Sequence, residues 1–332
     1  MSKKDILFKY EDGVCSYEYV TINGIKQYIQ IRGKSKTNPV LLVIHGGPGG
    51  AMSGLAHIMQ QKWEEEFTVV NFDQRNSGKT YVANKERAYD IGKTGTLDDY
   101  IKDVDEVIKY THTKYDFDKL YIMGFSWGSV VGAEYVKRNP QNVMAYIGVG
   151  QLVNYEKAFK FVCKKAMDKA KEANCVKDER RLAELIDKYP EENVMTADRM
   201  TMVRTFAMLA NKYLVKNAKT FPIGAILSSP FMKFKEKKAM FLSDINLYQK
   251  TYETMLSYDF TNNMKFDVPV YFMTGDEDVN CPLELIREQM DNMDAPHKKL
   301  FVIERASHMC FYDNPEMFNK ILIDIISINN TK

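Results

Sequence analysis

The chain has 332 residues, enough for one large core with an insertion, and its 45% hydrophobic and 27% charged residues are typical of a globular protein. A net charge of +2 gives no field strong enough to favour nucleic acid or an anionic membrane, so we expect a small-molecule or short-peptide substrate. Five cysteines without a C-x-x-C pair exclude an obvious disulfide framework, and no H-E-x-x-H motif indicates a metal. Together with the absence of an apolar N-terminal segment, these features predict a cytoplasmic protein without a cofactor. The sequence makes no prediction of the oligomeric state.

Strands and helices alternate through the first half of the chain. Asn23-Gly24 is the turn expected between two short strands of a hairpin, and Thr96 is expected to cap a helix. In chain order the predicted elements are strands 17–22, 26–31 and 39–44, a helix 52–65, a strand 68–72, a helix 97–110, a strand 120–125, a helix 129–138 and a strand 143–149. This alternation predicts an α/β fold with a mostly parallel central sheet and helices on both faces.

The pattern changes between residues 152 and 257, which form a stretch rich in Lys, Glu and Met with helical periodicity and no buried strand. We name this stretch the helical insertion and predict that it acts as a lid. The sheet resumes with strand 268–274, helix 283–290, strand 299–304 and a last helix 314–326. The predicted organisation is therefore a core in two parts, 1–151 and 258–332, with the lid at 152–257 between them.

Gly124-Phe125-Ser126-Trp127-Gly128 follows an apolar strand and precedes a helix. A sharp strand-to-helix turn needs small residues on both sides of the serine, and it leaves the serine hydroxyl exposed at the end of the sheet. Ser126 is therefore the candidate nucleophile. The N–H of Trp127, the next residue, is a candidate donor to a negatively charged oxygen in the transition state.

A glycine-rich loop, His45 to Gly50, follows the buried strand 39–44. A loop in this position supplies the second donor of an oxyanion hole when it lies beside a nucleophile elbow. Gly46 and Gly47 are both candidates, and the sequence leaves the choice between them open.

A serine hydroxyl needs a base, and the base needs an acid that orients it. Asp278 lies past a strand within Gly275-Asp276-Glu277-Asp278, four residues before Pro282, and we predict that it is the acid; Asp276 is the alternative, with a role in the turn. His308 lies on the loop between the last strand and the last helix and is the predicted base.

Taken together, the His-Gly-Gly-Pro-Gly-Gly loop at 45–50, Asp73-Gln74-Arg75, the elbow with its Trp127, Asp278 with Pro282, and His308 resemble the proline iminopeptidase family of α/β-hydrolases. The resemblance covers about residues 20–150 and 260–325. It implies the α/β-hydrolase fold, Ser126, Asp278 and His308 as a catalytic triad, and Trp127 with Gly47 or Gly46 as oxyanion donors.

The resemblance also implies an aminopeptidase that releases an N-terminal proline or another small apolar residue from short peptides. Family members hold the free amine of the substrate with glutamates in a lid that also carries tryptophan. The candidate glutamates here are Glu156, Glu184 and Glu253, although both tryptophans of this chain, Trp63 and Trp127, lie outside the lid. The methionines of the predicted lid are either core residues or an adaptable apolar wall over an acyl group; they are Met195, Met200, Met202 and Met208. A second possibility is an esterase or acyltransferase that uses the same triad on an ester or thioester. A third is a ligand-binding receptor that keeps the pocket without turnover.

Overall fold

The computed structural model describes residues 6, 10, 13–241 and 244–330, and these contain one sheet of eight strands. The strands lie in the order β1-β2-β4-β3-β5-β6-β7-β8. Their bounds are β1 Val14–Ile22, β2 Ile25–Gly33, β3 Val40–Ile44, β4 Thr68–Asp73, β5 Leu120–Phe125, β6 Val143–Val149, β7 Val270–Gly275 and β8 Lys298–Ile303. The pairs β1–β2 and β2–β4 are antiparallel, and every other neighbouring pair is parallel. The predicted mostly parallel sheet is confirmed.

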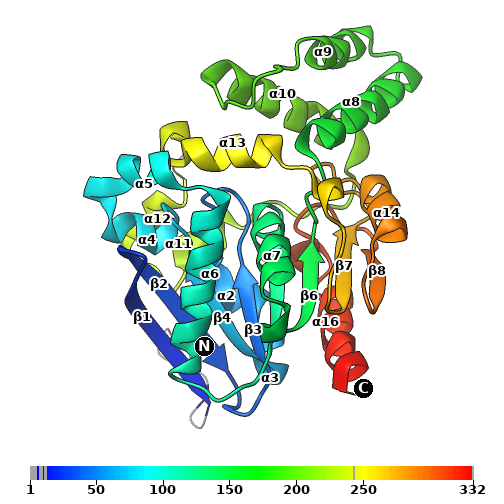
Figure 1. Cartoon of the computed structure of the whole chain (residues 1–332). Helices are drawn as coiled ribbons and strands as arrows, with labels where there is room; N and C mark the ends of the chain where they lie inside the picture. Colours follow the sequence, from blue (N-terminus) through cyan, green and yellow to red (C-terminus); the bar gives the residue numbers. More distant parts are fainter. Residues whose placement is uncertain (1–5, 7–9, 11–12, 242–243, 331–332) are drawn as a thin grey trace.

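Helices cover both faces of this sheet (Figure 1). Alternate residues of β3 show the division: Leu42 packs in a core beneath α6 and α7, whereas Leu41 and Val43 pack in a second core with α3 and α16 on the other face. Outside the helical insertion, the helices are α2 Ala56–Met59, α3 Trp63–Glu66, α4 Gly78–Ala83, α5 Ala88–Thr94, α6 Leu97–His112, α7 Trp127–Arg138, α14 Leu283–Asn292, α15 Cys310–Asp313 and α16 Pro315–Asn330. Because helices cover both faces of the sheet, its central strands are apolar along their length rather than at alternate positions.

Two local predictions are confirmed by backbone geometry. Asn23 and Gly24 both have positive φ, 47° and 76°, as the tight turn between β1 and β2 requires. Thr96 caps α6, because its hydroxyl accepts from the N–H of Asp99 at 3.3 Å while the Asp99 carboxylate accepts from the Thr96 N–H at 3.1 Å.

The predicted single helix 52–65 is wrong. The chain instead forms a 3-10 turn, Ser53–Leu55, and the two short helices α2 and α3. Glu64 turns inward to pair with Arg32 of β2 at 2.8 Å, and Gly54 lies so close to Met232 that an added Cβ would be 2.2 Å from the sulfur. These tertiary contacts bend a segment that local periodicity alone favours as one helix.

The helical insertion follows β6 and contains no strand among its described residues. Its helices are α8 Tyr155–Glu172, α9 Val176–Asp187, α10 Ala197–Leu214, α11 Ile223–Ser228, α12 Phe234–Ala239 and α13 Gln249–Ser257. Helices α8, α9 and α10 share an apolar core of their own and stand beyond the end of the sheet, where the parallel strands terminate (Figure 1). Within the described part of the chain, no helix has both the length and the apolar character needed to cross a membrane.

Candidate active site

Ser126 occupies the turn between β5 and α7 with φ 53° and ψ −119°, a backbone conformation that is costly for any residue other than glycine. Neighbouring bonds hold it there: its N–H donates to the Val149 carbonyl at 3.0 Å, and its carbonyl accepts from the N–H and the hydroxyl of Ser129 at 2.8 and 2.6 Å. The turn therefore has the geometry of a nucleophile elbow.

The glycines of this turn are required by close packing. A Cβ on Gly124 would lie 2.4 Å from the Gly128 carbonyl oxygen, and one on Gly128 would lie 2.0 Å from the Ile44 carbonyl oxygen. Backbone atoms cannot move aside as a flexible side chain can, so β3, β5 and α7 approach this closely only with glycine at both positions. The spacing of the Gly-x-Ser-x-Gly motif follows from this packing.

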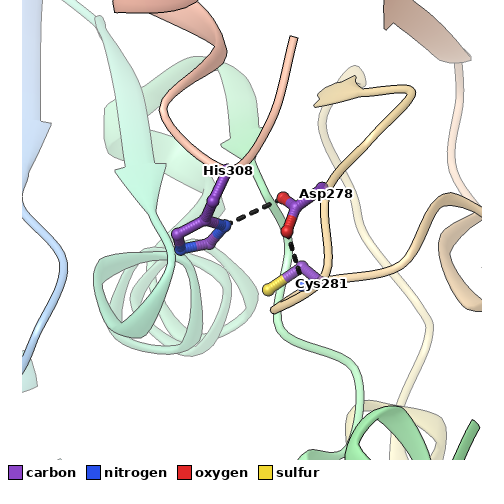
Figure 2. Close-up of side chains that lie close together, drawn as sticks. All are labelled: Asp278, Cys281 and His308. Atoms are coloured by element: carbon purple, nitrogen blue, oxygen red, sulfur yellow. Dashed lines mark hydrogen bonds and ion pairs between the residues drawn. The ribbon is translucent and has the colours of Figure 1, made fainter. Parts of the chain in front are cut away.

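Asp278 and His308 come together from the loops after β7 and β8 (Figure 2). The Nδ1 atom of His308 donates to Oδ2 of Asp278 at 2.8 Å, because an ionised carboxylate can only accept. The other oxygen, Oδ1, accepts from the backbone N–H groups of Asn280 and Cys281, each at 2.8 Å. Nε2 of His308 points away from the acid and remains available to a second partner (Figure 2).

The competing acid, Asp276, has a different environment. Its Oδ1 accepts from the N–H of Ala306 at 3.1 Å, so it joins the loop after β7 to the loop after β8. The structure thus brings Asp278, and not Asp276, to His308.

The glycine-rich loop lies directly against the elbow. A Cβ on Gly46 would be 3.0 Å from the Cβ of Ser126, and Gly47, with φ 125°, lines the cavity in front of the serine. Trp127 is the first residue of α7, and N–H groups in the first turn of a helix have no acceptor within it. The three predicted oxyanion donors, Trp127, Gly46 and Gly47, are therefore neighbours of Ser126.

His45 holds this loop in place. Its Nδ1 donates to the Gly46 carbonyl at 2.8 Å, and its Nε2 accepts from the Gln74 N–H at 3.0 Å. Burial lowers the pKa of His45, in agreement with a neutral ring that donates through one nitrogen and accepts through the other.

A cavity of about 450 Å³ opens in front of Ser126 and His308. Phe125 forms part of its wall and lies 4.9 Å from the His308 ring, centre to centre. Apart from Tyr155 and Tyr252, the side chains that the helical insertion contributes are apolar; they include Phe159, Met195, Met200, Val203 and Phe206. Among the described residues, no Asp, Glu, Lys or Arg lines it.

The three candidate glutamates of the helical insertion do not line this cavity. Each lies beside a lysine on its own helix: Glu156 and Lys160 are 2.5 Å apart, Glu184 and Lys188 3.6 Å, and Glu253 and Lys250 2.5 Å. Spacings of three or four residues place such pairs on one helix face. The structure offers no support for these glutamates as ligands of a substrate amine.

The four methionines divide between the two alternatives, core and cavity wall. Met195 and Met200 line the cavity, whereas Met202 packs in the core of α8, α9 and α10, and Met208 is 51% exposed. Helical periodicity alone does not say which side of α10 faces the sheet.

Several other wall residues were not predicted from the sequence, among them Leu152, Tyr155, Tyr252 and Asn280. A usable signal exists for Leu152 and Tyr155, because they come shortly after the end of β6 and ligands gather at the carboxyl ends of strands in such sheets. Tyr252, from α13, is brought to the cavity by tertiary structure alone.

Cys281 adds a thiol to this group, since one donor atom each of Asp278, Cys281 and His308 lie within 4.8 Å of one another. Burial raises the pKa of Cys281, which keeps the thiol protonated and a poor metal ligand. The Asp278 oxygens are also engaged by three N–H donors. The arrangement therefore fits an acid–base pair beside a neutral thiol better than a metal centre.

Comparisons with known proteins agree with this geometry. A family model described as the alpha/beta hydrolase fold matches residues 39–315. The chain is 28% identical to the probable aminopeptidase YbaC of Bacillus subtilis over 91% of this chain and 93% of that protein. It is 23% identical to a proline iminopeptidase of Thermoplasma volcanium, covering 95% and 98% of the two chains.

Among solved structures, the carboxylesterase CesB from Bacillus subtilis superimposes with a TM-score of 0.60 at 15% identity, covering 98% of this chain and 95% of that one. An eight-stranded sheet with a nucleophile elbow after β5 and a family match across most of its length give one conclusion: this chain belongs to the alpha/beta hydrolase fold family.

Proposed function

We propose that the protein is a serine hydrolase that acts through an acyl-enzyme. The observation that carries the proposal is the strained Ser126 at the mouth of a cavity that His308, bonded to Asp278, also lines. In this mechanism His308 Nε2 removes the Ser126 proton as Oγ attacks the substrate carbonyl. The N–H of Trp127, together with that of Gly46 or Gly47, stabilises the resulting oxyanion.

The remaining steps return the enzyme to its starting state. His308 gives its proton to the leaving group as the bond to the carbonyl carbon breaks, which leaves the acyl group on Ser126 Oγ. Water then attacks the acyl-enzyme, His308 accepts a water proton, and the same proton returns to Ser126 Oγ as the free acid leaves. Asp278 keeps Nδ1–H oriented and stabilises the imidazolium in both halves.

The cavity favours esters, or thioesters, of apolar acids. A substrate ammonium placed in it would lose its water without gaining a carboxylate, because no acidic side chain lines the wall. An uncharged acyl chain meets aromatic and methionine side chains and pays no such cost. Transfer of the acyl group to an acceptor other than water uses the same intermediate.

An aminopeptidase is the second candidate function. It is favoured by the names of the relatives that match almost the whole chain, the probable aminopeptidase and the proline iminopeptidase. It requires an acceptor for the substrate amine other than Glu156, Glu184 or Glu253, whose carboxylates lie beside lysines.

A fluorophosphonate probe tests the nucleophile. It should label the wild-type protein at Ser126, and Ser126→Ala should lose labelling and turnover while its melting temperature stays close to the wild-type value. Ser257→Ala removes an exposed serine of α13 and serves as the matched control, with unchanged labelling. Labelling that persists in Ser126→Ala would reject this nucleophile.

Three reporter substrates separate the candidates: a p-nitrophenyl ester of a short apolar acid, an amide of proline with a free amine, and the N-acetylated form of that amide. We expect the ester to have the highest kcat/KM and the acetylated amide to match or exceed the free one. A preference of more than tenfold for the free amine would instead establish the aminopeptidase. Labelling without turnover of any substrate, checked by burst kinetics, would indicate a receptor.

A further inference from the structure

Arg199, in the first turn of α10, is a buried cation without a counter-ion. Its side chain is 1% exposed, and it forms no ion pair with any carboxylate in the described part of the chain. Nη1 donates to the backbone carbonyls of Glu192 and Val194, and the guanidinium lies 4.8 Å from the centre of the Tyr189 ring. Nε and Nη2 are buried and make no hydrogen bond of normal geometry, and the guanidinium opposes the rise that burial causes in the pKa of Tyr189. Buried charges are normally paired, so this arrangement is incomplete as it stands.

Arg199 lies directly behind the cavity wall. Met195 and Met200, on either side of it in sequence, both line the cavity. Tyr189, beneath the guanidinium, packs on the cavity residue Phe159 with ring centres 5.1 Å apart. Burial raises the pKa of Tyr155, another wall residue, and the Arg199 charge opposes part of that increase. The guanidinium therefore contacts a residue, Tyr189, that packs directly on the cavity wall.

At the end of the cavity nearest the helical insertion, the nearby charged side chains are arginines. Arg204, one turn further along α10, is exposed, and its charge opposes the effect of burial on the pKa of the wall residue Tyr252. The acid of the active site, Asp278, is already hydrogen-bonded by His308 Nδ1 and two backbone N–H donors. A negatively charged group entering this end of the cavity would approach the Arg199 guanidinium without meeting a competing carboxylate from the described wall residues, whereas Arg204 lies at the exposed surface and does not line the cavity.

We propose that this end of the cavity binds a carboxylate carried by the far end of the acyl chain, with Arg199 as its ligand. The substrate class is then esters or thioesters of dicarboxylic acids, held with one carbonyl at Ser126 and the other carboxylate at Arg199. A carboxylate supplies acceptors for the Nε and Nη2 atoms in the paired geometry that guanidinium groups favour. Met195 and Met200 are flexible, so they can move aside to let the carboxylate reach Arg199. The inference rests on the proposed acyl-enzyme function.

The test compares p-nitrophenyl hemiesters of adipic, pimelic and suberic acid with twins whose far carboxylate is a methyl ester. These chain lengths avoid the self-cleavage of shorter hemiesters. For at least one length, kcat/KM of the charged substrate should exceed that of its neutral twin at least tenfold. Arg199→Gln should abolish this preference, mainly through KM, and leave the neutral twin within about threefold of wild type. Arg199→Lys should retain part of the preference.

Arg204→Gln is the matched control, because it removes an exposed cation from the same helix and should change the preference less than threefold. Equal or better hydrolysis of the neutral twin at every length by wild type would overturn the inference, as would an unchanged preference in Arg199→Gln. If Arg199→Gln does not fold, competitive inhibition of the wild type provides the test: monomethyl adipate, which keeps one free carboxylate, should inhibit more strongly than dimethyl adipate, and equal inhibition would overturn the proposal. Fluorophosphonate labelling and neutral-ester turnover are measured first, since their absence rejects the acyl-enzyme function instead.

Discussion

Asp278→Asn exchanges one carboxylate oxygen for an amide nitrogen and tests how His308 is oriented. In the wild type, Oδ1 accepts from the N–H groups of Asn280 and Cys281, and Oδ2 accepts from His308 Nδ1, all at 2.8 Å. An asparagine must keep its oxygen toward the two backbone N–H groups, because an NH₂ group there would face two donors. Its NH₂ group then faces His308.

Because the asparagine NH₂ group donates, Nδ1 of His308 must accept, so the imidazole carries its proton on Nε2 instead. That tautomer cannot accept the proton of Ser126. We expect kcat to fall about ten-thousand-fold, equivalent to roughly 5 kcal/mol of transition-state stabilisation. Stability should change little, because both backbone N–H groups keep their acceptor.

The assay is hydrolysis of a p-nitrophenyl ester together with the rate of fluorophosphonate labelling, which reports the reactivity of Ser126 directly. Asp276→Asn is the matched control: its oxygen can still accept from the Ala306 N–H, so the loss should stay within a few-fold. A loss below a hundredfold in Asp278→Asn, or a larger loss in Asp276→Asn, would refute the assignment of the orienting acid.

Two further predictions concern stability. Gly128→Ala places a Cβ 2.0 Å from the Ile44 carbonyl oxygen, so the free energy of unfolding in urea should fall by at least about 3 kcal/mol; Gly224→Ala, with no heavy atom within 4 Å, should change it by less than about 1 kcal/mol. Comparable losses in the two variants would contradict the packing argument. Burial lowers the pKa of His45. Below about pH 6.5 the unfolded chain therefore binds a proton that the folded chain resists, and the free energy of unfolding decreases as the pH is lowered. His45→Gln should make the slope of unfolding free energy between pH 7 and 5 shallower, and an unchanged slope would assign the effect to other groups.

Local backbone and packing requirements explain which features of this protein could be predicted from its sequence. The elbow at Ser126 is readable because close packing of strand and helix demands glycine at fixed spacings, and the hairpin at Asn23-Gly24 because a tight turn demands positive φ. The mostly parallel sheet with helices on both faces follows from the alternation of apolar runs and amphipathic helices. Asp278 and His308 could be predicted because the ends of parallel strands meet at one edge of the sheet, wherever they lie in the chain.

The orientation of the helical insertion relative to this edge depends on tertiary packing and could not be predicted from the sequence. Periodicity shows that α10 has an apolar side, but the docking of α10 onto α8 and α9 determines that Met200 lines the cavity, Met208 is exposed and Arg199 is buried. In the same way, Glu156, Glu184 and Glu253 could not be excluded as amine ligands until their helices were placed. A residue type specifies what a side chain can bind, whereas the packing of whole elements determines what it meets.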